Sequence, residues 1–353
     1  MQRHILHIGL PKTGTTALQR HYFPGLPESA VCYNPPHLLE PLIEAVKLLD
    51  FGMLREDDTQ FLSEILAHRS KKIRQPAVLI SLEILSQRLL KFDYRGRADF
   101  LKSIFPSATV VLILRYQPDL LRSLYQQQVR QNYFLPPEEV FLPPGRGRPA
   151  GADPARSSMT IDATEWDYTG TIEYYRELFG DRFHVEFFED YNGNMVNLGR
   201  GILESVGLKG EHHPSPAPIP KTNVSYDSTT MQILLTLARR RLAFRACAGF
   251  DSRHMRGLER EADQARFLFD APDRHTFRKR IRNRKDFSEH PCCVFDELLI
   301  KCIRKCCATL GSHRENRYEL PSDIRQCLER VSKDLNSSLP EVVHERRIPD
   351  RYL

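Results

Sequence analysis

The stretch that decides the fold lies near the N-terminus and reads Gly9-Leu10-Pro11-Lys12-Thr13-Gly14-Thr15-Thr16. An apolar stretch at residues 3–8 precedes it, and helix-forming residues follow from Ala17. A strand, a glycine-containing turn and a helix start aim backbone N–H groups and the positive end of the helix dipole at one point. Gly14 allows close approach of the backbone to a ligand, and the hydroxyls of Thr15 and Thr16 can donate to phosphate oxygens. The segment therefore predicts a phosphate-binding loop.

The lysine of this loop is displaced from its place in the nucleotide-hydrolase P-loop, G-x-x-x-x-G-K-[ST]. In that motif the lysine follows the second glycine and reaches the β- and γ-phosphates. Here Gly9 and Gly14 keep the spacing, but Thr15 takes the lysine position and the lysine is Lys12. The displacement predicts that Lys12 lies beside the bridging oxygen of a group attached to a 5′-phosphate.

Short apolar runs alternate with amphipathic stretches along the first two thirds of the chain, which is typical of a parallel sheet covered by helices. We expect strands at residues 3–8, 77–81, 109–114 and 182–188. We expect helices at residues 38–49, 59–73, 99–105, 118–132, 171–179 and 195–206. The Pro-rich segments 135–154 and 214–220 are predicted to be long loops without regular structure. The fold class is thus α/β, a P-loop-type parallel sheet flanked by helices.

Beyond residue 226 helix formers and charges dominate, with helices expected at residues 231–244, 255–269, 295–310 and 322–335. We therefore divide the chain into an α/β domain, 1–226, and a helical C-terminal portion, 227–353. This portion is expected to pack on the first domain and to shape the acceptor site.

A second anion site is predicted where the strand at 109–114 ends. Kinases and ATPases need an acidic residue near such a strand end to organise Mg²⁺, but this strand ends in Arg115, which is suited to bidentate phosphate contacts. Ser123 follows eight residues later, early in the next helix, and could join Arg115 on one phosphate. Two anion sites without an evident Mg²⁺ ligand indicate a nucleotide that carries separate phosphates.

The first loop resembles the 5′-phosphosulfate loop of the sulfotransferases that use 3′-phosphoadenosine 5′-phosphosulfate (PAPS), and the segment from Arg115 to Ser123 resembles their 3′-phosphate motif. The resemblance covers residues 1–226. It implies PAPS as the donor, no metal, and transfer of a sulfuryl group to a hydroxyl or amine. By the same resemblance, backbone amides from Thr13 to Ala17, through Gly14, and the side chains of Thr15 and Thr16 hold the 5′-phosphate. Lys12 stabilises the leaving group, and Arg115 and Ser123 bind the 3′-phosphate.

The general base is expected at Glu83, the one charge in the apolar stretch 77–85. An isolated buried carboxylate is costly, so it should be paired, exposed at a sheet edge, or catalytic. The resemblance places the base of sulfotransferases, His or Glu, in this region. The alternative is that Ser81 caps a helix starting near Leu82, with Glu83 merely favourable in its first turn. His7, within the first strand, is interpreted as a core histidine.

These residues are compatible with three hypotheses about the function of the protein. The leading hypothesis is a PAPS-dependent sulfotransferase whose acceptor is a carbohydrate hydroxyl, with protein tyrosine and small alcohols left open. The alternatives are a P-loop nucleotide or sugar kinase that uses ATP and Mg²⁺, and a non-catalytic nucleotide-binding protein.

Composition limits the partners. The chain of 353 residues has 51 Lys and Arg against 45 Asp and Glu, a net charge of +6, and 41% hydrophobic residues. These values fit a globular protein and, without a recognised module, disfavour nucleic-acid binding. The sequence shows neither a transmembrane run nor a secretory signal, so we expect a cytoplasmic protein with mostly free thiols.

Two features of the C-terminal portion, a basic run and a group of cysteines, each allow several interpretations. The basic run 274–285 is a solvated helix face, a site for an anionic acceptor such as an acidic glycan, or a donor contact. It lacks the glycine of the Arg-Lys-Gly loop with which cytosolic sulfotransferases close the donor site. The cysteines at 292–307 indicate helix packing, zinc or disulfides.

Overall fold

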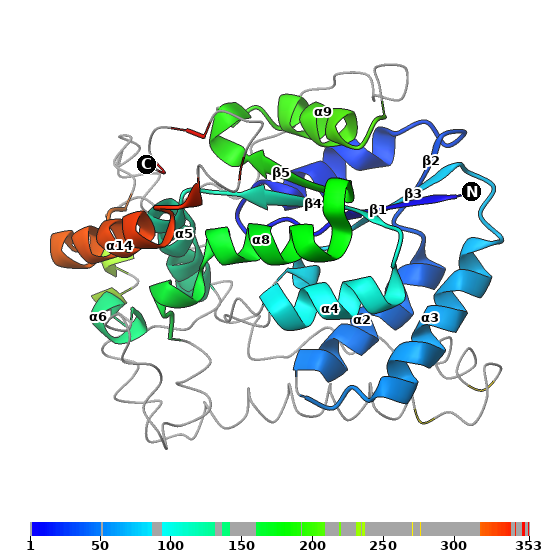
Figure 1. Cartoon of the computed structure of the whole chain (residues 1–353). Coiled ribbons are helices and arrows are strands. Elements are labelled where there is room, and N and C mark those ends of the chain that lie inside the picture. The colour runs from blue at the N-terminus through cyan, green and yellow to red at the C-terminus, as the bar shows by residue number, and fades with distance from the viewer. Residues whose placement is uncertain are drawn as a thin grey trace.

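The described residues of the computed structural model form a five-stranded sheet in the order β2-β3-β1-β4-β5, and all four pairings are parallel (Figure 1). The strands are β1 (Arg3–His7), β2 (Val31–Tyr33), β3 (Ala77–Ser81), β4 (Thr109–Leu114) and β5 (Phe183–Phe187). The structure describes residues 2–50, 52–86, 94–130, 136–141, 160–191, 193–208, 219, 231–233, 235–236, 270, 276, 318–339, 343, 348–349 and 352.

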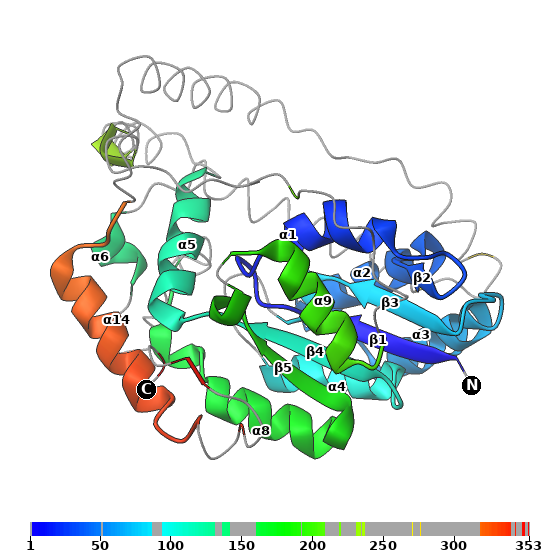
Figure 2. The same cartoon turned by 90° about the horizontal axis from the view of Figure 1, so that it is seen from above.

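Helices cover both faces of the sheet. The longer described helices are α2 (Pro36–Asp50), α3 (Glu56–Ser70), α4 (Tyr94–Ile104), α5 (Gln117–Arg130), α8 (Tyr168–Phe179), α9 (Met195–Ser205) and α14 (Ser322–Leu335). In Figure 1, α2, α3, α4 and α8 lie on one face of the sheet and α9 on the other. Figure 2 shows the sheet between α9 and the layer that contains α4.

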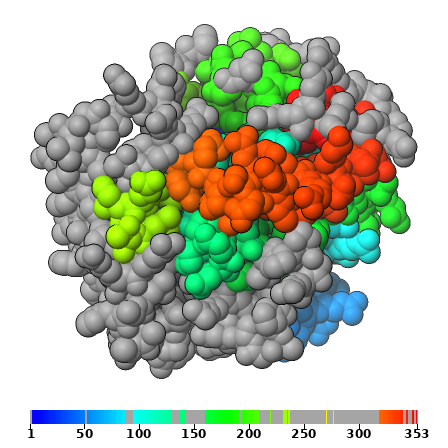
Figure 3. Space-filling model, turned by 90° about the vertical axis from the view of Figure 1, so that its left-hand side faces the viewer, coloured from blue at the N-terminus to red at the C-terminus, as the bar shows by residue number. Residues whose placement is uncertain are grey.

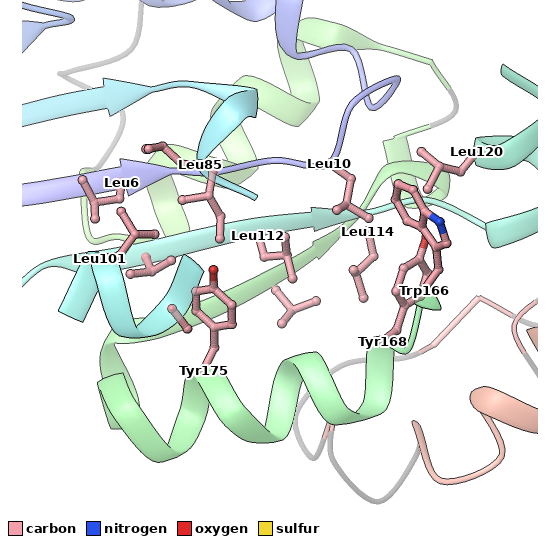
Figure 4. Close-up of a cluster of buried hydrophobic side chains, with 14 of the residues drawn as sticks. Leu6, Leu10, Leu85, Leu101, Leu112, Leu114, Leu120, Trp166, Tyr168 and Tyr175 are labelled. Atoms are coloured by element: carbon pink, nitrogen blue, oxygen red, sulfur yellow. The ribbon is translucent and has the colours of Figure 1, made fainter. Parts of the chain in front are cut away.

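Successive residues of a strand belong to two separate hydrophobic cores, because their side chains point to opposite faces of the sheet. Leu6 and Leu112 belong to the larger core, which Figure 4 shows between the sheet and α8. Ile5 and Val111, one residue earlier in each strand, belong to the smaller core together with Leu198 of α9. Burial of β3 and β4 on both faces explains why their sequences are continuous apolar runs.

The predicted α/β class is confirmed, and two of its strands, 77–81 and 109–114, have the predicted bounds. The edge strand β2 was missed because three residues give no periodicity. The expected helices within residues 1–208 are all present with shifted ends. The prediction of no regular structure at 135–154 is wrong for Pro137–Val140, which form the short helix α6. Residues 135 and 142–154, like most of 214–220, lie outside the described residues.

The described part of the C-terminal portion is mainly α14, whose predicted range is confirmed. It packs against α5 and against the short 3₁₀ helix η4 (Ala163–Glu165), and it forms the orange band across the face in Figure 3. An ion pair between Arg122 of α5 and Glu319, with an N–O distance of 2.8 Å, joins the same regions. The expected domain boundary near residue 226 and the other three C-terminal helices fall almost wholly outside the described residues. Among the helices the structure describes, none is long and apolar enough to cross a membrane.

Candidate functional site

The predicted site residues come from the carboxyl ends of three adjacent strands. The loop at residues 8–14 follows β1 in the middle of the sheet, while Glu83 follows β3 and Arg115 follows β4, the two neighbours of β1. From β1 the chain passes to β2 at one edge of the sheet, returns to β3 beside β1, and then crosses to β4 and β5 on the other side of β1. Such a switch in direction leaves a crevice at the carboxyl ends of the strands, where ligands of open α/β sheets bind.

The backbone of the loop has the left-handed turns that a phosphate-binding loop needs. Gly14 has φ 81° and Lys12, unusually for a residue with a side chain, has φ 66°. The buried hydroxyl of Thr13 donates to the carbonyl of Leu10 at 2.6 Å, so this side chain braces the loop from within. The amide of Ala17, which the resemblance assigned to the phosphate, donates to the Gly14 carbonyl at 2.9 Å and is therefore already used inside the loop.

Gly14 is also enclosed by two side chains from the part of the chain that follows β5. A Cβ atom at this position would overlap the Met195 sulfur at the start of α9 and would lie 3.6 Å from the Phe188 ring. Helix α1 (Thr15–Ala17) then begins directly after Gly14 and passes into the π-helical turn Leu18–Tyr22. The predicted strand, turn and helix are therefore all present, with the helix irregular from its second turn.

Glu83 lies against the hydroxyls of the loop. Thr15 Oγ1 donates to Glu83 Oε1, and Thr16 Oγ1 lies 3.5 Å from the same oxygen. The two threonines expected to hold phosphate and the expected base are thus brought together in the free protein.

Burial raises the pKa of Glu83 above its usual value, because desolvation disfavours the charged carboxylate. The Lys12 ammonium and the Thr16 hydroxyl act in the opposite direction, yet the net direction is upward. A carboxylate with a raised pKa is a stronger base than an exposed one, which suits proton abstraction near neutral pH. The Lys12 ammonium therefore lies near enough to Glu83 to act electrostatically on its carboxylate.

The alternative in which Ser81 caps a helix is wrong. Ser81 is the last residue of β3, and the turn that follows is the 3₁₀ helix η3 (Glu83–Leu85) without a side-chain cap. The Ser81 hydroxyl instead pairs with His7 Nδ1 at 2.7 Å, and Gln19 Nε2 lies 3.2 Å from the same oxygen. His7 is accordingly a buried core histidine, as predicted, and burial lowers its pKa to about 3.

Arg115 lies beside the loop, where its Nη1 donates to the Lys12 carbonyl at 2.5 Å. Its guanidinium also stacks over the Phe188 ring, with Cζ 5.1 Å from the ring centre. Nε is buried and has no hydrogen-bond partner among the described residues. An unpaired buried donor is costly unless a ligand accepts from it, so the guanidinium fits an anion-binding role.

Ser123, the predicted partner of Arg115, is half-buried in the second turn of α5. Arg115 belongs to the short connection between β4 and this helix, which starts at Gln117, whereas Ser123 lies inside the helix. The connection is fixed from outside by residues that the sequence did not single out. Tyr168 donates its hydroxyl to the Arg115 carbonyl at 2.7 Å, and the Tyr116 amide donates to Glu189 Oε1 at 2.9 Å.

Cysteines and the basic run add little to the site. Cys32 and Cys327 are free thiols, and the other six cysteines lie outside the described residues, as does nearly all of the run 274–285. In the part of the chain that the structure describes, no group of three or more His, Cys, Asp or Glu side chains could hold a metal ion.

Comparison with known proteins gives little. No family model matches the chain, and no curated protein matches it. Among solved structures, the chain is similar to a sulfotransferase from Alicyclobacillus acidocaldarius, with 18% identity and a TM-score of 0.40. That match covers 61% of this chain and 85% of the other. Likeness at this level assigns neither family nor function, which therefore depend on the residues of the site.

Proposed function

We propose that the protein is a sulfotransferase that moves a sulfuryl group from PAPS to an acceptor hydroxyl. The observation that carries the proposal is the convergence of Lys12, Glu83 and Arg115 at the carboxyl edge of three neighbouring strands. In this proposal the Lys12 ammonium stabilises the leaving group, the Glu83 carboxylate accepts a proton, and the Arg115 guanidinium binds a second phosphate. A kinase P-loop carries its lysine elsewhere.

The reaction is an in-line displacement at sulfur. The acceptor oxygen forms a bond to sulfur while the bond between sulfur and the bridging oxygen of the 5′-phosphate breaks. Glu83 takes the acceptor proton, and Lys12 stabilises the negative charge that develops on the bridging oxygen. The products are a sulfate ester and 3′-phosphoadenosine 5′-phosphate.

Binding of the donor is assigned to the loop and to the connection after β4. Backbone amides from Thr13 through Gly14 to Thr16, with the Thr15 and Thr16 hydroxyls, bind the 5′-phosphate in this proposal; the Ala17 amide is left out because it is bonded to Gly14. Arg115 and Ser123 bind the 3′-phosphate and hold the donor in line with the acceptor. The reaction as proposed needs no metal.

A carbohydrate hydroxyl is the proposed acceptor, supported by the Glu-type base that the family resemblance links to glycan-directed relatives. An acidic glycan would find counter-charges in the run 274–285. Protein tyrosine and small alcohols are the competing acceptors. Each contains the hydroxyl that a Glu83 base requires.

The test is transfer of labelled sulfate from PAPS into fractions of a whole-cell extract, followed by identification of the labelled product. Parallel reactions receive PAPS without metal, or ATP labelled at the γ-phosphate with Mg²⁺. Sulfate incorporation that is lost in Lys12→Met supports the proposal. Phosphate incorporation, or PAPS binding without turnover on any fraction, would replace it with the kinase or the non-catalytic alternative.

A further inference from the structure

Tyr352 lies at the carboxyl ends of β4 and β5. Its side chain is buried, with a relative exposure of 2%. The ring meets Phe187, the last residue of β5, edge to face at a centroid distance of 5.2 Å, and Tyr116, just after β4, at 5.8 Å. A residue far away in sequence therefore packs directly against the proposed donor site.

Glu189 connects Tyr352 to the backbone that carries Arg115. Its Oε2 accepts a hydrogen bond from the Tyr352 hydroxyl at 2.7 Å, and its Oε1 accepts from the Tyr116 amide at 2.9 Å. The two carboxylate oxygens thus accept from donors on two different segments, and hydrogen bonds to a charged acceptor are among the stronger ones in proteins. The peptide group between Arg115 and Tyr116 is held from outside the sheet by this carboxylate.

The same carboxylate also belongs to the segment that supports the guanidinium. Glu189 follows Phe188 in the 3₁₀ helix η6 (Phe188–Tyr191), and the Phe188 ring lies under the Arg115 guanidinium. A shift of Glu189 would consequently move both the backbone of Arg115 and the ring on which its side chain rests. Bidentate recognition of a phosphate depends on the orientation of the guanidinium plane.

We propose that Tyr352 and Glu189 are positioning residues that hold Arg115 in the orientation required to bind the donor's 3′-phosphate. The inference rests on the proposed function, since it takes PAPS as the donor. Neither residue needs to touch the nucleotide. Their effect should therefore fall on the 3′-phosphate contact and leave the 5′-phosphate loop unchanged.

The experiment compares two nucleotides that differ only in the 3′-phosphate, 3′-phosphoadenosine 5′-phosphate and adenosine 5′-monophosphate. Affinities for both are measured by calorimetry with the full chain and with Tyr352→Phe, which removes the hydroxyl and keeps the ring. We expect Tyr352→Phe to weaken binding of the bisphosphate about fivefold, the scale of the net contribution of one ordinary hydrogen bond, and to leave binding of the monophosphate within about twofold.

A matched control is Tyr174→Phe, because the Tyr174 hydroxyl also donates to a carboxylate, Asp99 Oδ1, at 2.7 Å, but on the exposed outer side of α8 and α4. It should leave both affinities unchanged. Equal weakening of both nucleotides by Tyr352→Phe, or no weakening at all, would overturn the inference. Failure of the proposed donor is seen separately, as a wild-type protein that does not prefer the bisphosphate.

Discussion

The hydroxyl of Thr15 donates a hydrogen bond to the carboxylate of Glu83, although the two residues are 68 positions apart in the sequence. The contact exists because β1 and β3 are parallel neighbours, with His7 in register with Ser81, so the segments that follow them emerge side by side. In the proposed complex the same hydroxyl donates a hydrogen bond to an oxygen of the donor's 5′-phosphate. Glu83 and the donor's 5′-phosphate therefore compete for Thr15, and both carry negative charge.

Glu83→Gln is expected to change nucleotide binding and turnover in opposite directions. Removal of the carboxylate relieves repulsion between like charges beside the loop, so 3′-phosphoadenosine 5′-phosphate should bind more tightly. Loss of the base should lower kcat by about 10²-fold or more. Calorimetry and a sulfate-transfer assay measure the two effects. Glu204→Gln, at an exposed position on α9, controls for the change in net charge, and a Glu83→Gln variant with wild-type turnover would remove Glu83 from the mechanism.

The same substitution should stabilise the fold at neutral pH. Because the pKa of Glu83 is raised in the folded protein, the folded state binds more protons than the unfolded state between the ordinary glutamate pKa and the raised one. The free energy of unfolding of the wild type therefore decreases as the pH rises through that window. Glu83→Gln has no carboxyl group to titrate, so its free energy of unfolding should not show this decrease. The difference in the free energy of unfolding between the variant and the wild type should therefore grow with pH in urea titrations. An advantage that is constant with pH would contradict the raised pKa.

Lys12→Met should separate catalysis from binding. The loop amides and hydroxyls remain to hold the 5′-phosphate, whereas the charge that stabilises the leaving group is gone. We expect kcat to fall by about 10²-fold or more, with a much smaller loss of affinity for the product nucleotide. Single-turnover sulfate transfer and calorimetry measure these effects. If the affinity for the product nucleotide and kcat/KM fell by the same factor while kcat was retained, Lys12 would contribute to binding of the ground state and not to catalysis.

The sequence was sufficient for the features that depend on local pattern. β3 and β4 are apolar runs because helices cover both faces of the sheet, and the loop is marked by its glycines and lysine. The nearness of Glu83 to Lys12 could be predicted because both follow strands of one parallel sheet. These are short-range patterns combined with one topological rule.

The contacts that hold Arg115 could not be predicted in the same way. Its bond to the Lys12 carbonyl spans 103 positions and requires both the pairing of β1 with β4 and a left-handed residue at Lys12. The bond between Tyr352 and Glu189 spans 163 positions, and neither residue lies in a motif. Such contacts follow from side-chain packing after the fold has formed. The sequence therefore predicts which groups carry the chemistry better than it predicts what holds them.

Gly14→Ala should destabilise the protein through two effects that a second glycine can separate. A left-handed backbone costs a residue with a side chain about 1–2 kcal/mol. Gly52 has a similar φ of 66°, and a Cβ atom added there would have nothing within 4 Å, so Gly52→Ala measures this backbone cost alone. At Gly14 the new methyl group also overlaps the Met195 sulfur. In urea unfolding, Gly14→Ala should lower the free energy of unfolding more than Gly52→Ala does, and Met195→Ala should restore part of that difference. Equal decreases at the two glycines would mean that the side chains around Gly14 move aside at no energetic cost.

His7 should make the fold sensitive to mild acid. Its pKa is lowered to about 3 by burial, so it stays neutral in the folded protein while the unfolded chain protonates it near pH 6.5. The unfolded state then binds more protons between these values, and the stability that is present above pH 6.5 is lost as the pH falls. Between about pH 7.5 and about pH 5 the wild type should lose about 2 kcal/mol relative to His7→Phe, which cannot protonate.

Urea titrations at the two pH values check this expectation, with His21→Phe, at an exposed position, as the control that should follow the wild type. His7→Phe removes the bond to Ser81, so it should be the less stable protein at the higher pH, and the difference should narrow in acid. A difference that is the same at both pH values would mean that His7 accepts a proton within the fold, and the pairing of its Nδ1 with Ser81 would then have to involve the charged ring.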